Sequence, residues 1–394
     1  MRKLLITGVI LLLLIGVETV SWSQSGINKQ ALEKLLKRAA ETHSDAVMIF
    51  KDSQLVGEYF SKERGKIELM SCTKSIVSLA IGKLIDAGKI KSLDQPVYEF
   101  YPEWKQGRKK LIAIRHLLNH TSGLQNVPNT GVEIYPSSDF VKLALAAEVS
   151  DEPGSKFSYN NKAVNLLAGI VQTTSGKRMD LYLRDEIFQP LGITDFDWML
   201  DRAGNPHAMA GLQLKAADFA KFGLLLLNKG LWDGKQIVSE KWIEESLQQG
   251  QPYNPTCGLL WWRIPSYERP IIDDEKFKEL EAAGVSKPFL SKLEPLRNKP
   301  FDSMPLFVKA LAERLGQQWN EILSQELSSK GLTLSRKKYG DIIGYNANGY
   351  LGQYLVIYPQ QKLVAVRQIR GSEKYSQQTD TFDDFFDLVR SLDN

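Results

Sequence analysis

Short apolar runs near both ends of the chain predict β-strands. Two early runs, Asp45–Lys51 and Gln54–Phe60, are separated by a polar turn, and two late runs, Gly352–Tyr358 and Lys362–Ile369, are separated by a turn that contains proline. Such pairs of runs are typical of β-hairpins, whereas parallel neighbours need a long crossover. With a further strand expected at Thr256–Ile264, we predict one antiparallel sheet built from both ends of the chain.

The segment between these strands is dominated by helical periodicity. In residues 91–230, apolar residues recur at three- and four-residue spacing, in stretches joined by loops rich in Gly and Pro. The helices predicted over the whole chain are Asn28–His43, Ser71–Ala87, Arg115–Asn119, Asn161–Thr174, Met179–Phe188, Ala216–Asn228 and Thr379–Leu392. The pattern indicates an α/β (α+β) protein in which residues 24–90 and 231–394 form a discontinuous sheet domain and residues 91–230 form an inserted, mainly helical domain.

Residues 265–339 form a second insertion of a different character. They are charged and helix-forming, and they carry apolar residues at helical spacing, among them Phe307, Leu311 and Leu315. An apolar stripe of this kind has to be buried against another surface. The sequence leaves two outcomes open: the helical insertion packs on the outside of the main body, or it caps the substrate cleft and restricts access to it.

The N-terminus has the pattern of a secretory signal peptide. Two basic residues precede the apolar run Leu4–Val17, and the small residues Ser21 and Ser23 provide a cleavage site. The apolar run is shorter than the roughly 20 residues that a membrane span needs. We expect residues 1–23 to be removed, so that the mature protein is secreted or periplasmic and is not stably inserted in a membrane.

The composition narrows the classes of protein that remain. Of 394 residues, 43% are hydrophobic and 24% are charged, as in ordinary globular domains. A formal net charge of +4 gives no electrostatic reason to expect a nucleic-acid partner. Cys72 and Cys257 allow one disulfide at most, and we expect them to stay unpaired. His116 and His120 have a metal-like spacing without a third ligand nearby, so we expect packing and loop hydrogen bonds from them and no metal or other cofactor.

The first candidate for chemistry is the segment Met70-Ser71-Cys72-Thr73-Lys74 at the start of a predicted helix. Ser71 and Lys74 are three positions apart, so both side chains can lie on one helix face. A serine hydroxyl becomes a good nucleophile when a neighbouring base, such as a neutral lysine amine, takes its proton. The helix N-terminus adds N–H groups and a positive dipole end where negative charge would develop. Taken alone, the S-x-x-K spacing is common by chance and more often marks a serine cap beside a solvated lysine.

Two further motifs carry polar groups that can act with Ser71. Tyr159 and Asn161 follow a turn and open a predicted helix; a phenol can shuttle protons, and an asparagine oxygen can hold a lysine amine. Gly349 and Tyr350 precede a predicted strand, where a glycine marks the close approach of a ligand or another backbone. The Tyr350 N–H is a candidate donor of an oxyanion hole. Taken singly, these motifs also fit packing, capping and a strand bulge.

Two more segments, Ile112–Leu124 and Ala210–Gly223, complete a set of motifs that resembles a known superfamily. Ser71–Lys74 matches an S-x-x-K element and Tyr159–Asn161 matches Y-x-N. In this order the motifs resemble the serine β-lactamase and penicillin-recognising superfamily, in its class C-like branch of esterases, D-alanyl carboxypeptidases and amidases similar to 6-aminohexanoate-dimer hydrolase. The resemblance implies a β-lactamase-like fold, with the active site between the sheet and the helical domain.

The resemblance also implies a role for each site residue. Ser71 would attack a carbonyl and form an acyl-enzyme, with Lys74 and Tyr159 carrying its proton. Asn161 would position Lys74. The backbone N–H groups of Ser71 and Tyr350, the latter next to Gly349, would hold the oxyanion.

The late strand departs from the pattern of many members of the superfamily. Those members place a Lys or His there to bind a substrate carboxylate, but Gly344–Gly352 contains no Lys, Arg or His. It is more similar to members with G-x-x-G-Q, some of which hydrolyse linear amides and esters. We therefore expect an exported serine hydrolase that acts on a small-molecule or short peptide-like ester or amide. A D-alanyl carboxypeptidase or β-lactamase and a non-catalytic penicillin-recognising binding module remain as alternatives, and the oligomeric state stays open.

Overall fold

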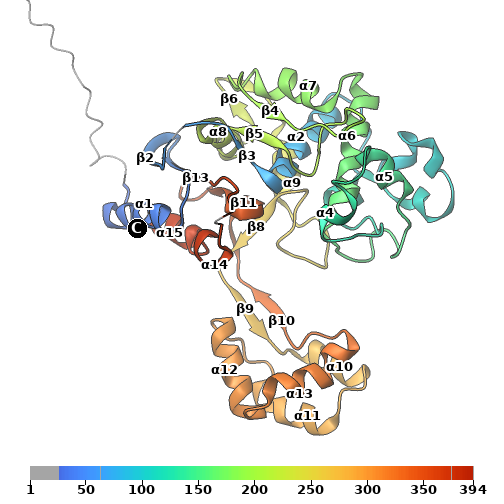
Figure 1. The fold of residues 1–394 in the computed structure, drawn as a ribbon, viewed down its shortest axis with the longest axis vertical. Coiled ribbons are helices and arrows are strands. Elements are labelled where there is room, and N and C mark those ends of the chain that lie inside the picture. Colours follow the sequence, from blue (N-terminus) through green and yellow to red (C-terminus); the bar gives the residue numbers. More distant parts are fainter. Residues whose placement is uncertain (1–25, 63, 374, 394) are drawn as a thin grey trace, which may run out of the picture.

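The computed structural model of the protein describes residues 26–62, 64–373 and 375–393 (Figure 1). The predicted signal peptide, residues 1–23, lies outside the described residues. Within the described ranges, no helix has both the length and the apolar character needed to cross a bilayer.

The α-helices are α1 (Lys29–Glu41), α2 (Thr73–Asp86), α3 (Ile114–Leu118), α4 (Thr130–Glu133), α5 (Phe140–Ala146), α6 (Asn161–Ser175), α7 (Met179–Leu183), α8 (Ala216–Leu227), α9 (Glu240–Leu247), α10 (Asp274–Ala282), α11 (Lys287–Leu293), α12 (Met304–Leu315), α13 (Trp319–Glu326), α14 (Gln377–Asp380) and α15 (Phe385–Arg390). The strands are β1 (Ala46–Lys51), β2 (Gln54–Phe60), β3 (Ile67–Glu68), β4 (Asp197–Trp198), β5 (Leu212–Leu214), β6 (Leu231–Trp232), β7 (Lys235–Gln236), β8 (Trp262–Pro265), β9 (Glu268–Ile271), β10 (Arg336–Tyr339), β11 (Ile342–Gly349), β12 (Gln353–Tyr358) and β13 (Leu363–Gln368).

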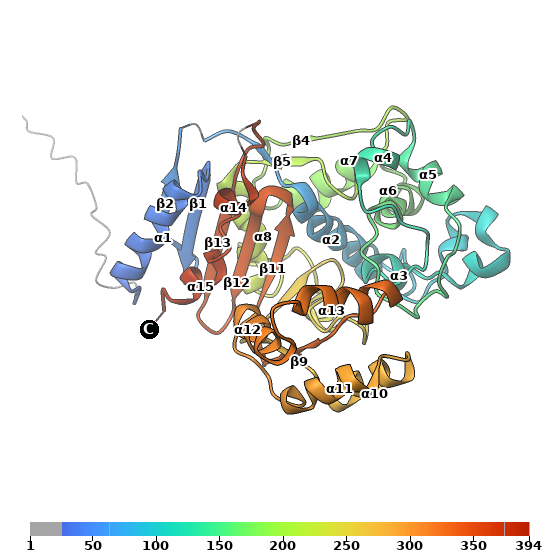
Figure 2. The same ribbon diagram turned by 60° about the horizontal axis from the view of Figure 1, so that its bottom comes forward.

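Six of these strands form the central sheet, in the order β2-β1-β13-β12-β11-β8, and every neighbouring pair is antiparallel. The predicted antiparallel sheet built from both ends of the chain is therefore confirmed. The two ends of the chain meet where β1 pairs with β13, and there Ala46 lies opposite Gln368. Figure 2 shows α1 and α15 on one side of the sheet and α8 on the other.

Alternation along the strands divides the sheet between two hydrophobic cores. In β1, Val47 and Ile49 belong to the core under α1 and α15, whereas Ala46 and Met48 belong to the larger core on the opposite face. That larger core continues through α8, α2 and α6 into the helical part of the molecule. The helices that carry the candidate catalytic residues are thus packed onto the sheet by continuous apolar contact.

Two predicted elements differ from the structure. The strand predicted at Thr256–Ile264 is reduced to β8, because Leu260 has a left-handed φ of 63° that interrupts the extended chain. Its apolar neighbours Leu259 and Trp261 are buried without being part of a strand. The C-terminal helix predicted at Thr379–Leu392 is interrupted at Phe382, which has a φ of 59° and buries its ring in the core beside α15.

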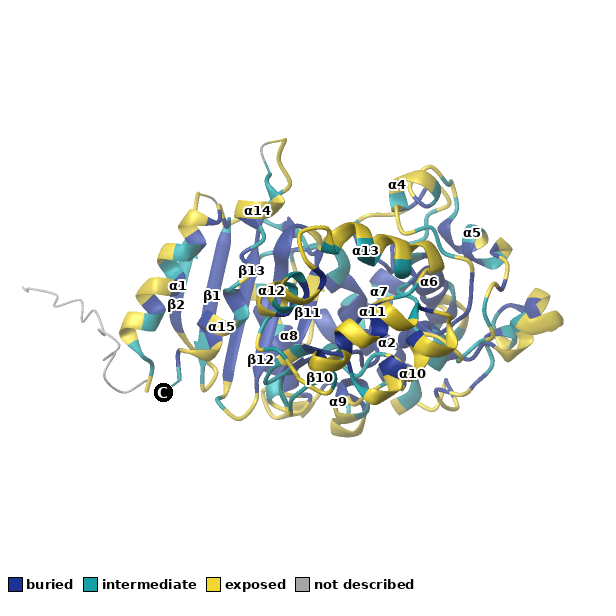
Figure 3. Ribbon diagram, turned by 90° about the horizontal axis from the view of Figure 1, so that it is seen from below, coloured by how far each residue is buried: buried dark blue, intermediate teal, exposed yellow. Residues whose placement is uncertain are grey.

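The second insertion is attached to the body by the two-stranded ribbon β9–β10, which the sequence did not predict (Figure 1). The apolar stripe Phe307, Leu311 and Leu315 packs on the other helices of the insertion, in a core formed entirely by residues 272–334. The expectation that the stripe is buried on the main body or over the cleft is therefore wrong. Figure 3 shows that the outer faces of these helices are exposed.

The insertion joins the sheet at the end that is remote from the candidate site. It returns to the sheet at Ile342, while Gly349 lies at the other end of β11. At about 3.3 Å per residue, the two ends of this eight-residue strand are roughly 23 Å apart. No residue of the insertion lines the described pocket around Ser71.

Candidate active site

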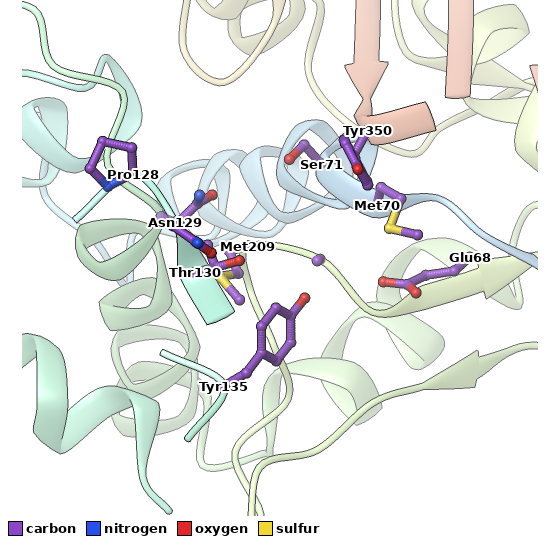
Figure 4. Close-up of a pocket in the computed structure, with 11 residues that line it drawn as sticks. Glu68, Met70, Ser71, Pro128, Asn129, Thr130, Tyr135, Met209 and Tyr350 are labelled. Atoms are coloured by element: carbon purple, nitrogen blue, oxygen red, sulfur yellow. The ribbon is translucent and has the colours of Figure 1, made fainter. Parts of the chain in front are cut away.

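A sharp turn of the chain presents Ser71 at the beginning of α2. Met70 has a φ of 49°, in the left-handed region that is unfavourable for a side chain of this size. Met70–Cys72 then form a single 3-10 turn, and the α-helix proper begins at Thr73 rather than at Ser71 as predicted. Ser71 consequently lies just before the α-helix and lines the pocket (Figure 4).

Three predicted residues converge on one oxygen atom. Lys74 Nζ donates a hydrogen bond to Ser71 Oγ at 2.9 Å, and the Tyr159 hydroxyl donates to the same oxygen at 2.9 Å. Lys74 is only 3% exposed, and its amine lies 5.0 Å from the centre of the Tyr159 ring. The nucleophile and two proton carriers are thus within hydrogen-bond reach, which is the arrangement required to activate a serine.

Lys74 is held in place by residues that the sequence did not identify. Lys74 Nζ donates its second hydrogen bond to the Met209 carbonyl at 2.6 Å, and no hydrogen bond from it to Asn161 is present among the described residues. The Met209 and Ala208 N–H groups both donate to Asn165 Oδ1 at 3.1 Å. The asparagine that fixes the lysine environment is therefore Asn165, one helical turn beyond the predicted one.

Asn161 nevertheless lies in the pocket, at the start of α6. Its Oδ1 is buried and has no hydrogen-bond partner among the described residues. An unpaired buried carbonyl oxygen carries a desolvation cost of about 1–3 kcal/mol. A donor on a substrate would remove that cost, so the arrangement suits Asn161 to binding rather than to holding Lys74.

Gly349 and Tyr350 lie where β11 ends beside Ser71. A Cβ on Gly349 would come within 2.6 Å of the Leu69 carbonyl oxygen and 3.2 Å of Met70 Cβ, so glycine is required for this close approach. Tyr350 is 72% exposed and lines the same pocket as Ser71. Gly349 is therefore packed against the segment that leads into Ser71, and Tyr350 follows it directly in the chain.

A buried arginine fixes the turn that follows Tyr350. Arg367 is fully buried and donates to the carbonyl oxygens of Leu351 and Gly352 at 3.0 and 2.8 Å. It also donates to the Ser44 hydroxyl at 2.9 Å. Desolvation lowers the pKa of Arg367 to about 10, which leaves the guanidinium charged at neutral pH. The turn is held by hydrogen bonds from a charged donor, which are stronger than those from a neutral one.

The pocket has a volume of about 580 Å³. It is lined by Glu68, Met70, Ser71, Pro128, Asn129, Thr130, Tyr135, Asn161, Met209, Ala210 and Tyr350 (Figure 4). Glu68 and Tyr135 lie toward one end, and Asn129 and Thr130 lie toward the other. No sequence pattern pointed to these four residues, because loop and short-strand positions acquire their neighbours only from the tertiary fold.

His116 and His120 form hydrogen bonds with loop backbone, and Cys72 and Cys257 are buried. His120 Nδ1 accepts the Asn160 N–H at 3.2 Å, and burial together with the nearby Lys74 lowers the pKa of His120 to about 3. His116 Nδ1 accepts from the Ala113 N–H at 3.2 Å. Both cysteines are free and buried, as predicted. Within the described ranges, no group of three or more His, Cys, Asp or Glu side chains has the geometry of a metal site.

His207 lies behind the pocket rather than in it. It is buried and packs against Phe140 and Tyr135, with ring centres 4.4 and 6.2 Å apart. Desolvation lowers the pKa of His207, so its imidazole is neutral at neutral pH. Its contact with the site is indirect, through the Tyr135 ring.

Comparison with known proteins agrees with this geometry. Residues 32–262 match the family model described as Beta-lactamase. The chain is 26% identical over 249 residues to the 6-aminohexanoate-dimer hydrolase of Paenarthrobacter ureafaciens, a match that covers 56% of this chain and 61% of that protein. It is 29% identical over 153 residues to Esterase EstB of Burkholderia gladioli, covering 34% and 38% of the two chains. Each match spans less than two thirds of the relative's length.

A solved structure extends the likeness over nearly the whole chain. The octameric penicillin-binding protein homologue from Pyrococcus abyssi matches with a TM-score of 0.58 at 18% identity, covering 92% of this chain and 76% of that one. At this identity the match concerns the fold, and it confirms the predicted β-lactamase-like fold class. Since the family model spans well over half of the residues, the chain belongs to the beta-lactamase family.

Proposed function

We propose that the protein is an exported serine hydrolase that cleaves an ester or linear amide bond through an acyl-enzyme on Ser71. The observation that carries the proposal is the pair of 2.9 Å hydrogen bonds that Lys74 and Tyr159 donate to Ser71 Oγ, in a serine that lines the pocket. Export rests on the signal-peptide pattern of residues 1–23. Membership of a family whose matched relatives include an amide hydrolase and an esterase supports hydrolysis.

In the proposed reaction, Ser71 Oγ attacks the substrate carbonyl carbon and its proton passes to the Lys74–Tyr159 pair. The negative charge on the tetrahedral oxygen is held by the N–H groups of Ser71 and Tyr350. One such donor typically contributes about 10²–10³ in kcat. The proton is returned to the leaving alcohol or amine, and water then hydrolyses the acyl-enzyme with the same pair as base.

The preference for esters and linear amides over β-lactams follows from the charges in the pocket. No Lys, Arg or His is among the described residues that line it, and none occurs in the sequence Gly344–Gly352. A substrate carboxylate that enters a partly desolvated site without a cationic partner pays a desolvation penalty. Because about 1.4 kcal/mol corresponds to a tenfold change in rate, even part of that penalty suppresses turnover of carboxylate-bearing β-lactams.

The test is labelling and turnover with a matched pair of serine variants. We expect a fluorophosphonate to label the wild-type protein on Ser71, and p-nitrophenyl acetate to give a burst of p-nitrophenol. Ser71→Ala should abolish both signals, while Ser329→Ala, at an exposed serine in the insertion, should retain both. Full turnover by Ser71→Ala would refute the mechanism, and a wild type that is neither labelled nor active would indicate the binding module. Nitrocefin turnover within about tenfold of the best ester would refute the argument from the missing cation.

A further inference from the structure

Glu68 is the one charged residue among the described residues that line the pocket. It lies at the end of β3, two positions before Met70, and Figure 4 shows its carboxylate directed into the open space between Met70 and Tyr135. One oxygen accepts the Gly211 N–H at 3.1 Å, which fixes the orientation of the side chain. The carboxylate is therefore a positioned group of the pocket wall.

The negative charge of Glu68 is not neutralised by the protein. Within the described ranges no ion pair involves Glu68; the nearby Lys66 pairs instead with Asp195 and Asp197, at 2.6 and 2.8 Å. Burial raises the pKa of Glu68, and the Gly211 N–H offsets this only in part. A half-buried carboxylate without a cation is destabilising. Such a group is stabilised when a cation from outside enters the pocket.

Tyr135 completes this end of the pocket with an aromatic ring. It is 44% exposed, and its pKa is raised by burial and by the charge of Glu68. An aromatic face and a carboxylate on the walls of one cavity form a suitable environment for an organic ammonium group, which gains both cation–π and charge–charge attraction. Lys74 does not occupy this end, because its amine is directed to Ser71 and Met209.

We propose that the pocket end formed by Glu68 and Tyr135 binds a positively charged ammonium group of the substrate, so that the enzyme prefers cationic esters or amides. The inference rests on the proposed function, since it concerns the substrate of the same site. A metal ion fits this end poorly. Cations such as calcium need several oxygen ligands, whereas Glu68 offers one carboxylate and belongs to no metal-like cluster among the described residues.

The test compares substrates that differ only in charge. One set consists of p-nitrophenyl esters whose acyl chains, of three lengths, end in trimethylammonium or in the isosteric tert-butyl group. A second pair, acetylcholine and 3,3-dimethylbutyl acetate, places the charge on the alcohol. In at least one pair we expect kcat/KM to be about tenfold or more higher for the cationic member, as a charge pair close to a protein surface allows. Glu68→Gln should reduce that ratio to near one, and Glu313→Gln, an exposed site in the insertion, should preserve it.

Binding of hexyltrimethylammonium, measured by calorimetry, separates this inference from the proposed reaction. Binding that weakens about tenfold in Glu68→Gln supports the ammonium site even if no ester is hydrolysed, an outcome that would refute only the reaction. Ratios near one in every substrate pair, or a ratio that Glu68→Gln leaves unchanged, would refute the ammonium site while leaving the serine hydrolase in place. Equal binding of the probe to wild type and Glu68→Gln would refute it as well.

Discussion

Replacing Gly349 with alanine should impair catalysis in addition to lowering stability. An added Cβ would lie 2.6 Å from the Leu69 carbonyl oxygen and 3.2 Å from Met70 Cβ, and ordinary contact begins at 3.4 Å. The backbone at the end of β11 must therefore retreat by several tenths of an ångström from the segment that presents Ser71. That movement separates the two proposed oxyanion donors, Ser71 and Tyr350.

The size of the effect follows from this overlap. A misplacement of about 1 Å in an active site can cost about 10²-fold in rate, and loss of one oxyanion donor costs about 10²–10³. We expect Gly349→Ala to lower kcat for p-nitrophenyl acetate by about 10²-fold, with a smaller change in KM, because the oxyanion exists only in the transition state. Overpacking of this kind also costs about 1–3 kcal/mol of folding free energy.

Gly344→Ala is the matched control. A Cβ on Gly344 would come within 2.6 Å of the Tyr358 ring and 2.7 Å of the Ile357 carbonyl oxygen, an overlap similar to that at Gly349. Both glycines belong to β11, but Gly344 lies roughly 17 Å further from the site at about 3.3 Å per residue. Urea unfolding should show comparable losses of stability in the two variants, while the burst and steady-state rates should fall only in Gly349→Ala. If folded Gly349→Ala kept the wild-type kcat, Tyr350 would not be the oxyanion donor.

Three further predictions concern other parts of the structure. The buried Lys162 Nζ lies 2.5 Å from Glu133 Oε1. Lys162→Met should lower the free energy of unfolding, measured by chemical denaturation, by about 3–5 kcal/mol, because it leaves the Glu133 carboxylate unpaired. The double variant Lys162→Met/Glu133→Gln should recover much of that loss. Equal stability of the single and double variants would contradict this. Because the pKa of His120 is lowered to about 3, the unfolded chain binds one proton more than the native state as the pH falls below about 6.5. As the pH is lowered from 6 to 4, the free energy of unfolding should fall more steeply in the wild type than in His120→Asn, by about 1.4 kcal/mol per pH unit. Equal slopes of unfolding free energy against pH in the two proteins would exclude a neutral buried imidazole. Replacing residues 267–338 with a short Gly-Ser linker should leave the ratio of the hydrolysis rates of a small and a bulky ester unchanged, because no residue of the insertion lines the described pocket. A selective increase in the rate for the bulky ester would show that the insertion restricts access.

Local sequence signals were sufficient where one element determines the geometry. The S-x-x-K spacing places Ser71 and Lys74 within 2.9 Å because both lie at the start of one helix. Gly349 correctly indicated a close backbone approach, because only the absence of a side chain at this one position allows it. The short apolar run Asp45–Lys51 likewise predicted a strand, which is β1 in the structure.

Prediction failed where the geometry depends on contacts between distant segments. Lys74 donates to the Met209 carbonyl, and the loop that carries Met209 is held by Asn165 rather than by Asn161. Helical periodicity could not distinguish the two asparagines, because both lie on the same helix. An apolar run does not reveal a left-handed residue such as Leu260, so the strand before the insertion was predicted too long. The stripe of α12 likewise does not specify its partner, and the insertion buries it internally.

The position of Tyr159 relative to Ser71 depends on the loop that contains His120, Leu124 and Asn126, because this loop holds the backbone around Tyr159 by hydrogen bonds. The middle residue of the Y-x-N motif, Asn160, is almost fully buried and makes four hydrogen bonds. Its N–H donates to His120 Nδ1 and its Nδ2 donates to the Leu124 carbonyl. Its Oδ1 accepts the Ala163 N–H as the cap of α6, and its carbonyl accepts the Val164 N–H. The Tyr159 carbonyl accepts from Asn126 Nδ2 at 2.8 Å. These bonds hold the backbone on both sides of the Tyr159 side chain.

The Tyr159 ring is positioned by the same loop. Its centre lies 4.5 Å from that of the His120 imidazole, which burial keeps neutral, so His120 can both accept the Asn160 N–H and pack against the ring. A protonated imidazole could not accept that hydrogen bond. The loop therefore couples the position of the proposed proton carrier to the protonation state of a residue that does not touch the substrate pocket.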